Sequence, residues 1–181
     1  PLTREEKEVV ANLRGLGSAY HVPDWVEYLR VKNSEGKTWF GFGIEDNLSN
    51  VRLRFFKPRP GLAKELGFRV DGKVGSTIRT ISRKMDTVTI VEGFTDAIRL
   101  DQRRTDIIIL NGASNSSHIK EEMLRNYKHV CVATDADLAG EKAYLKIKEI
   151  CPKARRVRWD GLAKDIDEAL KNGFRLYLAR G

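Results

Sequence analysis

Residues 130–140 carry the sequence VCVATDADLAG, and this stretch decides the fold of the second half of the chain. Its first four residues are apolar, as in a short buried strand, and residues 141–150 place apolar side chains along one stripe of a helix. Asp135 and Asp137 therefore stand on the turn where a strand becomes a helix. Such turns lie at the edge of a parallel α/β sheet where ligands bind. Two neighbouring carboxylates repel each other there unless they share a cation, and oxygen ligands select a hard ion such as Mg²⁺.

Strands and helices alternate on both sides of this stretch. We expect strands at residues 87–93, 106–110, 129–135 and 154–159, and helices at residues 95–104, 118–127, 141–150 and 164–173. This alternation predicts an α/β fold with a Rossmann-like parallel sheet of about four strands, right-handed crossovers and flanking helices.

The first half of the chain follows a different pattern. Thr3 and Glu6 have the spacing of a capping box, which predicts a helix that ends at Gly15 or Gly17. Residues 21–31, HVPDWVEYLRV, are expected to form a second short helix. Segments rich in β-forming residues favour a hairpin or meander, at residues 37–44, 50–56, 65–70 and 75–81. We therefore predict two domains: a smaller α+β, largely antiparallel subdomain at residues 1–84 and a catalytic α/β domain at residues 85–181.

The composition is that of a globular protein. Of the 181 residues, 41% are hydrophobic and 32% charged, which suits one large or two small domains with real cores. No apolar run approaches the length of a membrane span, and no signal-peptide pattern opens the chain. Two cysteines without zinc-site spacing favour buried thiols in a reducing compartment. We expect a cytoplasmic protein with no membrane partner and no zinc in this chain, and the start at Pro1 indicates a piece of a longer protein.

The positive charge is concentrated in one segment. Residues 52–84 contain ten basic and two acidic residues, so this segment carries a net charge of +8, equal to that of the whole chain. Phenylalanines interleave with these basic residues, which favours contact with nucleic acid over a merely solvated face. The candidate contacts to nucleic acid or nucleotide are Arg52, Arg54, Lys57, Lys64 and Lys73.

Acidic residues follow several of the predicted parallel strands. Glu92 ends the first strand, Asp135 and Asp137 follow the third, and the fourth is followed by Asp165 and Asp167. Asp96 lies one helical turn beyond Glu92. Metal ions held by such a cluster would bridge carboxylates to phosphate oxygens. The alternative for each Asp is a plain helix cap or a first-turn acid favoured by the helix dipole.

Four motifs in order resemble a known family. Residues 91–98, VEGFTDAI, and residues 135–140, DADLAG, resemble the two signatures of the topoisomerase–primase (Toprim) domain. The pattern Glu-Gly-aromatic-x-Asp-x-Ile in the first signature resembles bacterial-type DNA primases. Residues 110–119, LNGASNSSHI, and residues 164–170, KDIDEAL, resemble two further stretches of those primases. The resemblance covers roughly residues 85–172, and the first half more faintly resembles the other subdomain of the primase catalytic core.

The resemblance implies roles for the acidic residues. Glu92 is similar to the Toprim glutamate, a general acid/base or metal ligand, and Asp135 and Asp137 resemble the Mg²⁺ ligands. These three are the candidate catalytic residues. Further metal-site residues are implied at Asp165, Asp167 and Asp96.

The resemblance also implies a function. It is that of a DNA primase catalytic core, which synthesises RNA primers on a DNA template with Mg²⁺ or Mn²⁺ in bacterial or phage replication. The implied partners are single-stranded DNA, nucleoside triphosphates and a replicative helicase, fused or separate. Two alternatives stay open: a Toprim metal-dependent nuclease, in which water replaces the primer hydroxyl, and a non-catalytic nucleic-acid-binding fragment of a replication protein.

Overall fold

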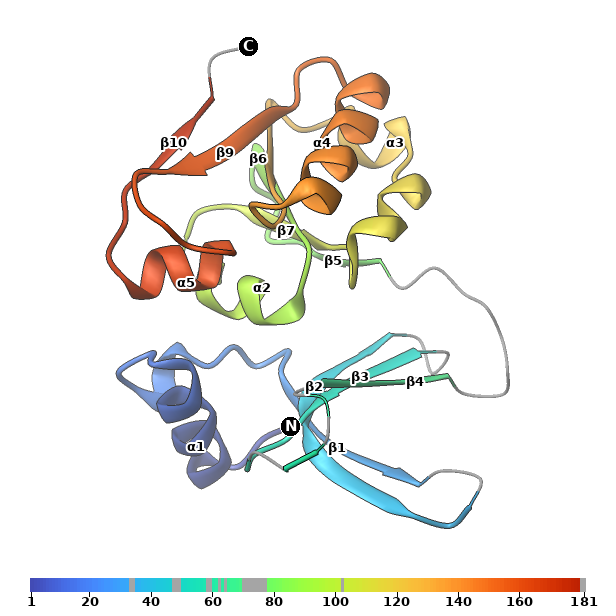
Figure 1. Cartoon of the computed structure of the whole chain (residues 1–181), viewed down its shortest axis with the longest axis vertical. Coiled ribbons are helices and arrows are strands. Elements are labelled where there is room, and N and C mark those ends of the chain that lie inside the picture. Colours follow the sequence, from blue (N-terminus) through green and yellow to red (C-terminus); the bar gives the residue numbers. More distant parts are fainter. Residues whose placement is uncertain are drawn as a thin grey trace. The chain divides into compact units, whose positions relative to one another are not determined.

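The chain divides into two compact units in a computed structural model. The units are Pro1–Gly75 and Ser76–Gly181 (Figure 1). The structure describes residues 1–32, 35–46, 50–57, 60–61, 63, 65–69, 78–101 and 103–179. The sequence-based domain boundary at residue 84 lies further along the chain than this division. Strand β5 (Arg79–Ile81), which lies between the two boundaries, pairs with a strand of the second unit.

The first unit begins with the predicted capped helix. Helix α1 (Arg4–Arg14) starts after Thr3, whose hydroxyl accepts a hydrogen bond from the Glu6 amide. The Glu6 carboxylate in turn accepts one from the Thr3 amide at 2.7 Å, which completes the capping box. Gly15 ends the helix with φ at 60°, a left-handed conformation that glycine adopts without a steric penalty. The sequence prediction of this helix is confirmed.

The predicted second helix at residues 21–31 is wrong. A 3-10 turn, η1 (Ala19–His21), is followed by strand β1 (Glu27–Lys32), which pairs antiparallel with β2 (Thr38–Asp46). Within β1, the side chain of Leu29 is buried whereas Tyr28 and Arg30 are exposed. This alternation is the period of a strand. A segment this short takes the structure that its partner strand stabilises, and β2 supplies those hydrogen bonds.

The antiparallel meander predicted for the first unit is confirmed, except that the segment predicted at residues 75–81 contributes strand β5 to the sheet of the second unit instead. Four strands pair in the order β1-β2-β3-β4, where β3 is Asn50–Arg54 and β4 is Glu65–Arg69. Leu53, Trp39 and Phe55 are buried in a core on this sheet. Gly43 is required for close pairing, because a Cβ atom there would lie 1.8 Å from the carbonyl oxygen of Arg52 on β3.

The second unit contains the predicted parallel sheet. Its strand order is β10-β9-β8-β6-β7-β5, and the four inner strands are parallel: β6 (Thr87–Val91), β7 (Asp106–Ile109), β8 (His129–Ala133) and β9 (Arg155–Trp159). The edge strands β5 and β10 (Leu176–Leu178) run antiparallel to their neighbours. The β10 strand was not predicted, since three residues carry too little periodicity to identify a strand.

Helices cover both faces of this second sheet. On one side, α2 (Phe94–Leu100) packs against α5 (Ile166–Lys171), and on the other η2 (Ala113–His118) packs against α4 (Leu138–Ile150) (Figure 1). The helix predicted at residues 118–127 is shorter than expected: α3 spans Glu121–Leu124. Val88, Ile90, Val132 and Ile147 are fully buried between sheet and helices. In the part of the chain that the structure describes, no helix combines the length and apolarity needed to cross a membrane.

A buried carboxylate at the amino-terminal end of strand β7 links the segments that lie at that end of the parallel sheet. Asp106, the first residue of β7, is 1% exposed. Its Oδ1 accepts hydrogen bonds from the amides of Arg83 and Met85, and its Oδ2 accepts from Ser82 Oγ and the Tyr127 hydroxyl. Burial alone would raise the pKa of Asp106, but these donors together hold its pKa below the ordinary value. Conversely, burial and the bond to Asp106 raise the pKa of Tyr127 to about 12.

Replacing Asp106 with Asn should destabilise the second unit by at least about 2 kcal/mol, because hydrogen bonds to a charged group contribute about 1.5–3 kcal/mol each. A carboxyl group whose pKa is lowered in the folded state stabilises the fold above its ordinary pKa of about 4. This stabilisation is lost as the pH falls through the lowered pKa. The free energies of unfolding of wild type and variant, measured in urea, should therefore converge as the pH falls below about 4.

Tyr127→Phe, which removes one donor, should destabilise the second unit less than Asp106→Asn does. Absorbance titration should show the Tyr127 pKa of Asp106→Asn below that of the wild type, and an unchanged pKa would contradict the proposed bond.

Candidate active site

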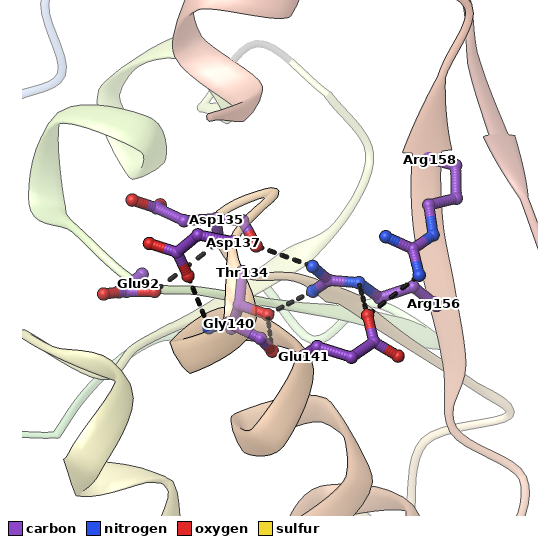
Figure 2. Close-up of polar contacts among 8 residues, drawn as sticks. All are labelled: Glu92, Thr134, Asp135, Asp137, Gly140, Glu141, Arg156 and Arg158. Carbon is purple, nitrogen blue, oxygen red and sulfur yellow. Dashed lines mark hydrogen bonds and ion pairs between the residues drawn. The ribbon is translucent and has the colours of Figure 1, made fainter. Parts of the chain in front are cut away.

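Three of the predicted acids meet at the carboxyl edge of the parallel sheet. Strands β6 and β8 are neighbours in register, with Val91 opposite Ala133, so the residues that follow them lie side by side. Glu92 follows β6, whereas Asp135 and Asp137 follow β8. The Asp135 amide lies 3.5 Å from Glu92 Oε2, and the three carboxylates lie close together (Figure 2). The structure thus brings together the residues proposed as catalytic from two separate stretches of sequence.

Asp137 also acts as a helix cap. It is the N-cap of α4, and its Oδ1 accepts a hydrogen bond from the Gly140 amide at 2.8 Å. Gly140 packs against the acidic turn so closely that a Cβ atom there would lie 2.1 Å from the Asp135 carbonyl oxygen. The glycine of the DADLAG motif is therefore needed to seat the helix on the turn. Capping uses one oxygen of Asp137, so a cap and a metal ligand are compatible at this residue.

The other predicted metal-site acids have local partners. Asp165 is the N-cap of α5 and accepts from the Glu168 amide at 2.8 Å. Asp167 forms an ion pair with Arg99 of α2, with Nε and Oδ1 2.9 Å apart and each side chain 12% exposed. Asp96 is 4% exposed and accepts from the Gly93 amide at 3.0 Å. Arg99 was not identified from the sequence, and its partner Asp167 lies 68 positions away along the chain.

Burial and mutual repulsion shift the titration of the central acids. Burial raises the pKa of Glu92, and the charge of Asp135 adds to this effect. Burial likewise raises the pKa of Asp135, against the opposing attraction of Lys164. The pKa of Asp96 is raised well above its ordinary value by burial and by Asp165. These acids are close enough to repel one another, so a proton or a cation stabilises the cluster.

A loop from the fourth parallel strand contacts the acidic turn. The Ala136 amide donates to the Lys164 carbonyl oxygen at 2.7 Å. The Lys164 ammonium lies 3.4 Å from Asp135 Oδ2 with its side chain 69% exposed. An open cavity of about 490 Å³ adjoins this contact and is lined in part by Arg158, Trp159 and Lys164. Sequence reasoning included Lys164 in a motif without assigning it a role, although its position directly before Asp165 was a signal.

Arg156 is a further residue of the site that sequence reasoning did not identify. Its side chain, from strand β9, is 1% exposed and donates to Thr134 Oγ1 and to the Asp135 carbonyl oxygen (Figure 2). A buried arginine requires partners, because an unpaired buried charge is strongly unfavourable. An Arg inside a predicted strand of the parallel sheet, ARRVRW at residues 154–159, was the available signal.

The acids fit a hard cation by their chemistry. Among the residues that the structure describes, no group of three or more His, Cys, Asp or Glu side chains is arranged to enclose a metal ion. Mg²⁺ does not require such a cage, since it usually keeps several waters and binds one or two carboxylates plus substrate phosphates. Glu92, Asp135 and Asp137 offer carboxylate oxygens of this kind.

The predicted basic contacts lie in the first unit. Arg52 and Arg54 on β3 are half-buried, and Lys57 beyond the strand is exposed. Lys64 and Lys73 lie outside the described residues. The basic segment is not entirely available for a ligand, because Arg83 forms an ion pair with Asp101 at 2.5 Å within the second unit. The nucleic-acid contacts of the first unit thus remain predictions.

Comparison with known proteins agrees with this fold. Residues 89–170 match the model of a family described as Toprim-like. No curated protein sequence matches the chain. The primase fragment of the bacteriophage T7 primase-helicase protein is similar in structure, with a TM-score of 0.56 and 17% identity over 93% of this chain and 65% of that one. A DNA primase domain from Pseudomonas aeruginosa gives a TM-score of 0.53 and 19% identity over 81% of this chain and 53% of that one.

These findings define the second unit. Residues 89–170 match the Toprim-like family model, and the fold of the chain is similar to that of the two primase structures. The fold class predicted from the sequence is therefore confirmed. The chain spans 65% and 53% of the lengths of the two primase structures, and identities below 20% establish the fold alone.

The raised carboxyl pKa values predict how stability depends on pH and metal. A carboxyl group with a raised pKa stabilises the fold below its ordinary pKa of about 4, and this contribution is lost as the pH rises through the raised value. As the pH rises above about 4 in EDTA, wild type should therefore lose stability relative to Asp135→Asn. The variant also loses Lys164 as a partner, but this ion pair contributes little because the Lys164 side chain is 69% exposed.

Mg²⁺ should restore the stability of the wild type at pH 8. The expected gain is about 1 kcal/mol when Mg²⁺ is about fivefold above its Kd, or about 2–4 °C in Tm. Asp135→Asn should gain less. Glu149→Gln, at an exposed position on α4, is the matched control and should behave as wild type. Parallel pH profiles for wild type and Asp135→Asn would contradict the electrostatic account.

Proposed function

We propose that this chain is the catalytic core of a DNA primase, which synthesises RNA primers on a single-stranded DNA template from nucleoside triphosphates. The observation that carries the proposal is the meeting of Glu92, Asp135 and Asp137 at the carboxyl edge of a Toprim-like domain. The fold of this chain resembles that of the T7 primase fragment over 93% of its length, which supports the proposed primase function.

The reaction transfers a nucleotidyl group. The 3′ hydroxyl of the growing primer attacks the α-phosphate of the incoming nucleotide, a phosphodiester bond forms, and pyrophosphate leaves. Glu92, Asp135 and Asp137 would hold Mg²⁺ or Mn²⁺, which when bound would neutralise charge on the triphosphate. Glu92 is also suited to accept the proton of the hydroxyl, because burial and the nearby Asp135 raise its pKa toward the working pH.

Basic side chains would bind the phosphates. Lys164 and Arg158, at the cavity beside the acidic turn, offer positive charge to a nucleoside triphosphate. In the first unit, Arg52, Arg54 and Lys57, with Lys64 and Lys73, are proposed to contact the template or nucleotide. Acidic side chains at Asp96, Asp165 and Asp167 would support the metal site by their charge, although Arg99 offsets the charge of Asp167.

A replicative helicase, fused or separate, is the further partner that we propose. The T7 structure is named as part of a primase-helicase protein, which motivates this proposal. The corresponding setting is bacterial or phage DNA replication in the cytoplasm.

One experiment separates this function from its rivals. The chain is incubated with single-stranded DNA, labelled ribo- or deoxyribonucleotides, and Mg²⁺ or Mn²⁺. Elongated products support primase activity. Shortened template would indicate a metal-dependent nuclease, which could use the same acids with water as the nucleophile. Template binding without either product would indicate a non-catalytic nucleic-acid-binding module.

Conservative changes at the acids should abolish synthesis and spare the fold. Asp135→Asn and Asp137→Asn remove ligand charge, and Asn at position 137 still caps α4 because asparagine is a good N-cap residue. Glu92→Gln should slow incorporation by at least about 100-fold, the scale of general acid–base contributions. Circular dichroism checks folding and labelled-nucleotide incorporation measures the rate. Asp160→Asn, at an exposed residue paired with Arg175, is the control and should retain the wild-type rate. Normal rates in both Asp variants would refute the assignment.

The basic side chains of the first unit should give template binding a strong salt dependence. Each phosphate contact on single-stranded DNA contributes about −0.7 to the slope of log K against log salt. Arg54→Gln with Lys57→Gln should flatten the slope by about 1.4 if each residue contacts one phosphate. Binding should weaken equally for all template sequences, because phosphate contacts carry no sequence information.

The control for this prediction uses exposed basic residues of the second unit. Arg155 on β9 and Lys146 on α4 are both exposed, whereas Arg156 is unsuitable because it is buried against the acidic turn. Arg155→Gln with Lys146→Gln should leave the slope near the wild-type value in a fluorescence anisotropy titration. Equal flattening by both pairs would mean that net charge alone governs binding.

A further inference from the structure

Arg156 is the largest fully buried side chain in the described part of the chain, and it lies directly behind the acidic turn. Its Nη2 donates to the Asp135 carbonyl oxygen at 2.7 Å, and its Nη1 donates to Thr134 Oγ1 (Figure 2). Burying a guanidinium is costly, and apolar residues of similar volume often give equal or greater stability. A buried arginine bonded to this particular turn therefore suggests a role beyond packing.

The two groups that Arg156 contacts belong to the segment that sets the carboxylates. Thr134 Oγ1 also donates to the Gly140 carbonyl oxygen at 2.7 Å, which ties the turn to the first turn of α4. The Asp135 carbonyl belongs to the peptide between the two acids' backbones. A rotation of that peptide would move the carboxylates of both Asp135 and Asp137 relative to Glu92. By bonding the Asp135 carbonyl oxygen, the Arg156 guanidinium thus restrains the peptide whose rotation would move the Asp135 and Asp137 carboxylates away from Glu92.

Glu141 provides a negative charge beside Arg156. Its Oε2 lies 3.7 Å from Arg156 Nε and 2.8 Å from Arg158 Nη2. The first distance is an ion pair and not a hydrogen bond. The Tyr144 ring lies 5.9 Å from the guanidinium carbon, within reach of a cation–π interaction. Glu141 and Tyr144 are on α4, the helix that Asp137 caps, so one helix carries both a proposed ligand and the groups that position Arg156.

We propose that Arg156 is a positioning residue for the cation site. Its planar guanidinium bonds the Thr134 hydroxyl and the Asp135 carbonyl at once and so holds Asp135 and Asp137 in the arrangement that binds the cation with Glu92. The inference rests on the proposed metal site. A lysine cannot replace it, because an ammonium group lacks the rigid fork that reaches two fixed acceptors. Groups that orient metal ligands typically change metal affinity by about 10- to 100-fold when removed.

The test measures Mn²⁺ binding by the electron paramagnetic resonance signal of the free ion, at a temperature where each variant is folded. Arg156→Met and Arg156→Lys should raise the Mn²⁺ dissociation constant by about tenfold or more. Arg155→Met is the matched control, because it removes an exposed positive charge from the neighbouring position on β9 and leaves the bonds of Arg156 to the turn intact. It should stay within about twofold of the wild type in Mn²⁺ affinity. In primer synthesis, the Arg156 variants should lose kcat while template affinity is retained.

A second pair of variants keeps the test decisive if the Arg156 variants do not fold. Thr134→Val removes the hydroxyl that links Arg156 to the Gly140 carbonyl, whereas Thr134→Ser retains it. Mn²⁺ affinity should fall in Thr134→Val and return in Thr134→Ser. If folded Arg156→Lys and Thr134→Val bind Mn²⁺ as wild type does and differ only in Tm, Arg156 is a stability residue and the inference is overturned.

The outcomes also separate this inference from the proposed function. Wild-type synthesis together with wild-type Mn²⁺ affinity in the folded variants would overturn the positioning role and leave primase activity standing. Mn²⁺ binding that follows the expected order, in a chain that makes no primer, would support the positioning role and count against primase activity. A wild-type chain that binds no Mn²⁺ would remove both the metal site and the inference.

Discussion

Like charges gathered at one edge of a parallel sheet are the constraint on which the second unit depends. Strands β6 and β8 end side by side, so Glu92 lies next to the turn that carries Asp135 and Asp137, with 3.5 Å between Glu92 Oε2 and the Asp135 amide. Burial raises the pKa of Glu92, and the charge of Asp135 adds to this effect. Burial also raises the pKa of Asp135, and the charges of Asp165 and Asp137 add to the rise while Lys164 opposes it. The fold must therefore hold in place groups that repel each other, and the energy for this comes from the surrounding hydrogen bonds and apolar core.

The acids contribute to the fold while remaining suited to chemistry. Asp137 and Asp165 each cap a helix with one oxygen, and Arg99 pairs with Asp167. Basic groups lie on both sides of the turn that carries Asp135: the Lys164 ammonium near its carboxylate and the Arg156 guanidinium at its carbonyl. In this arrangement the backbone of the turn is held by hydrogen bonds to other parts of the protein, whereas carboxylate oxygens of the turn can still contact a cation. Such preorganisation would serve the metal-assisted nucleotidyl transfer that we propose for this chain.

Sequence reasoning succeeded where one local signal was strong. Alternating apolar strands and amphipathic helices identified the four parallel strands, and Thr3 with Glu6 identified the first helix. It failed at residues 21–31, where a short amphipathic segment fits either a helix or a strand until β2 is available as a partner. It also missed β10 and overestimated the helix after residue 118. For the two strands, the deciding hydrogen bonds join residues beyond the window in which periodicity can be measured.

The sequence by itself determined the order of the four parallel strands and the helices between them, the Toprim-like motifs and the acids that follow three of those strands, because these depend on local spacing. Only the tertiary structure decided which groups meet. It paired Asp167 with Arg99 and placed the Arg156 guanidinium against the Asp135 carbonyl. The partners of each pair come from different elements, and the distance between them depends on sheet order and helix packing. No local pattern of residues encodes such a contact, since it exists only after the parallel strands have paired.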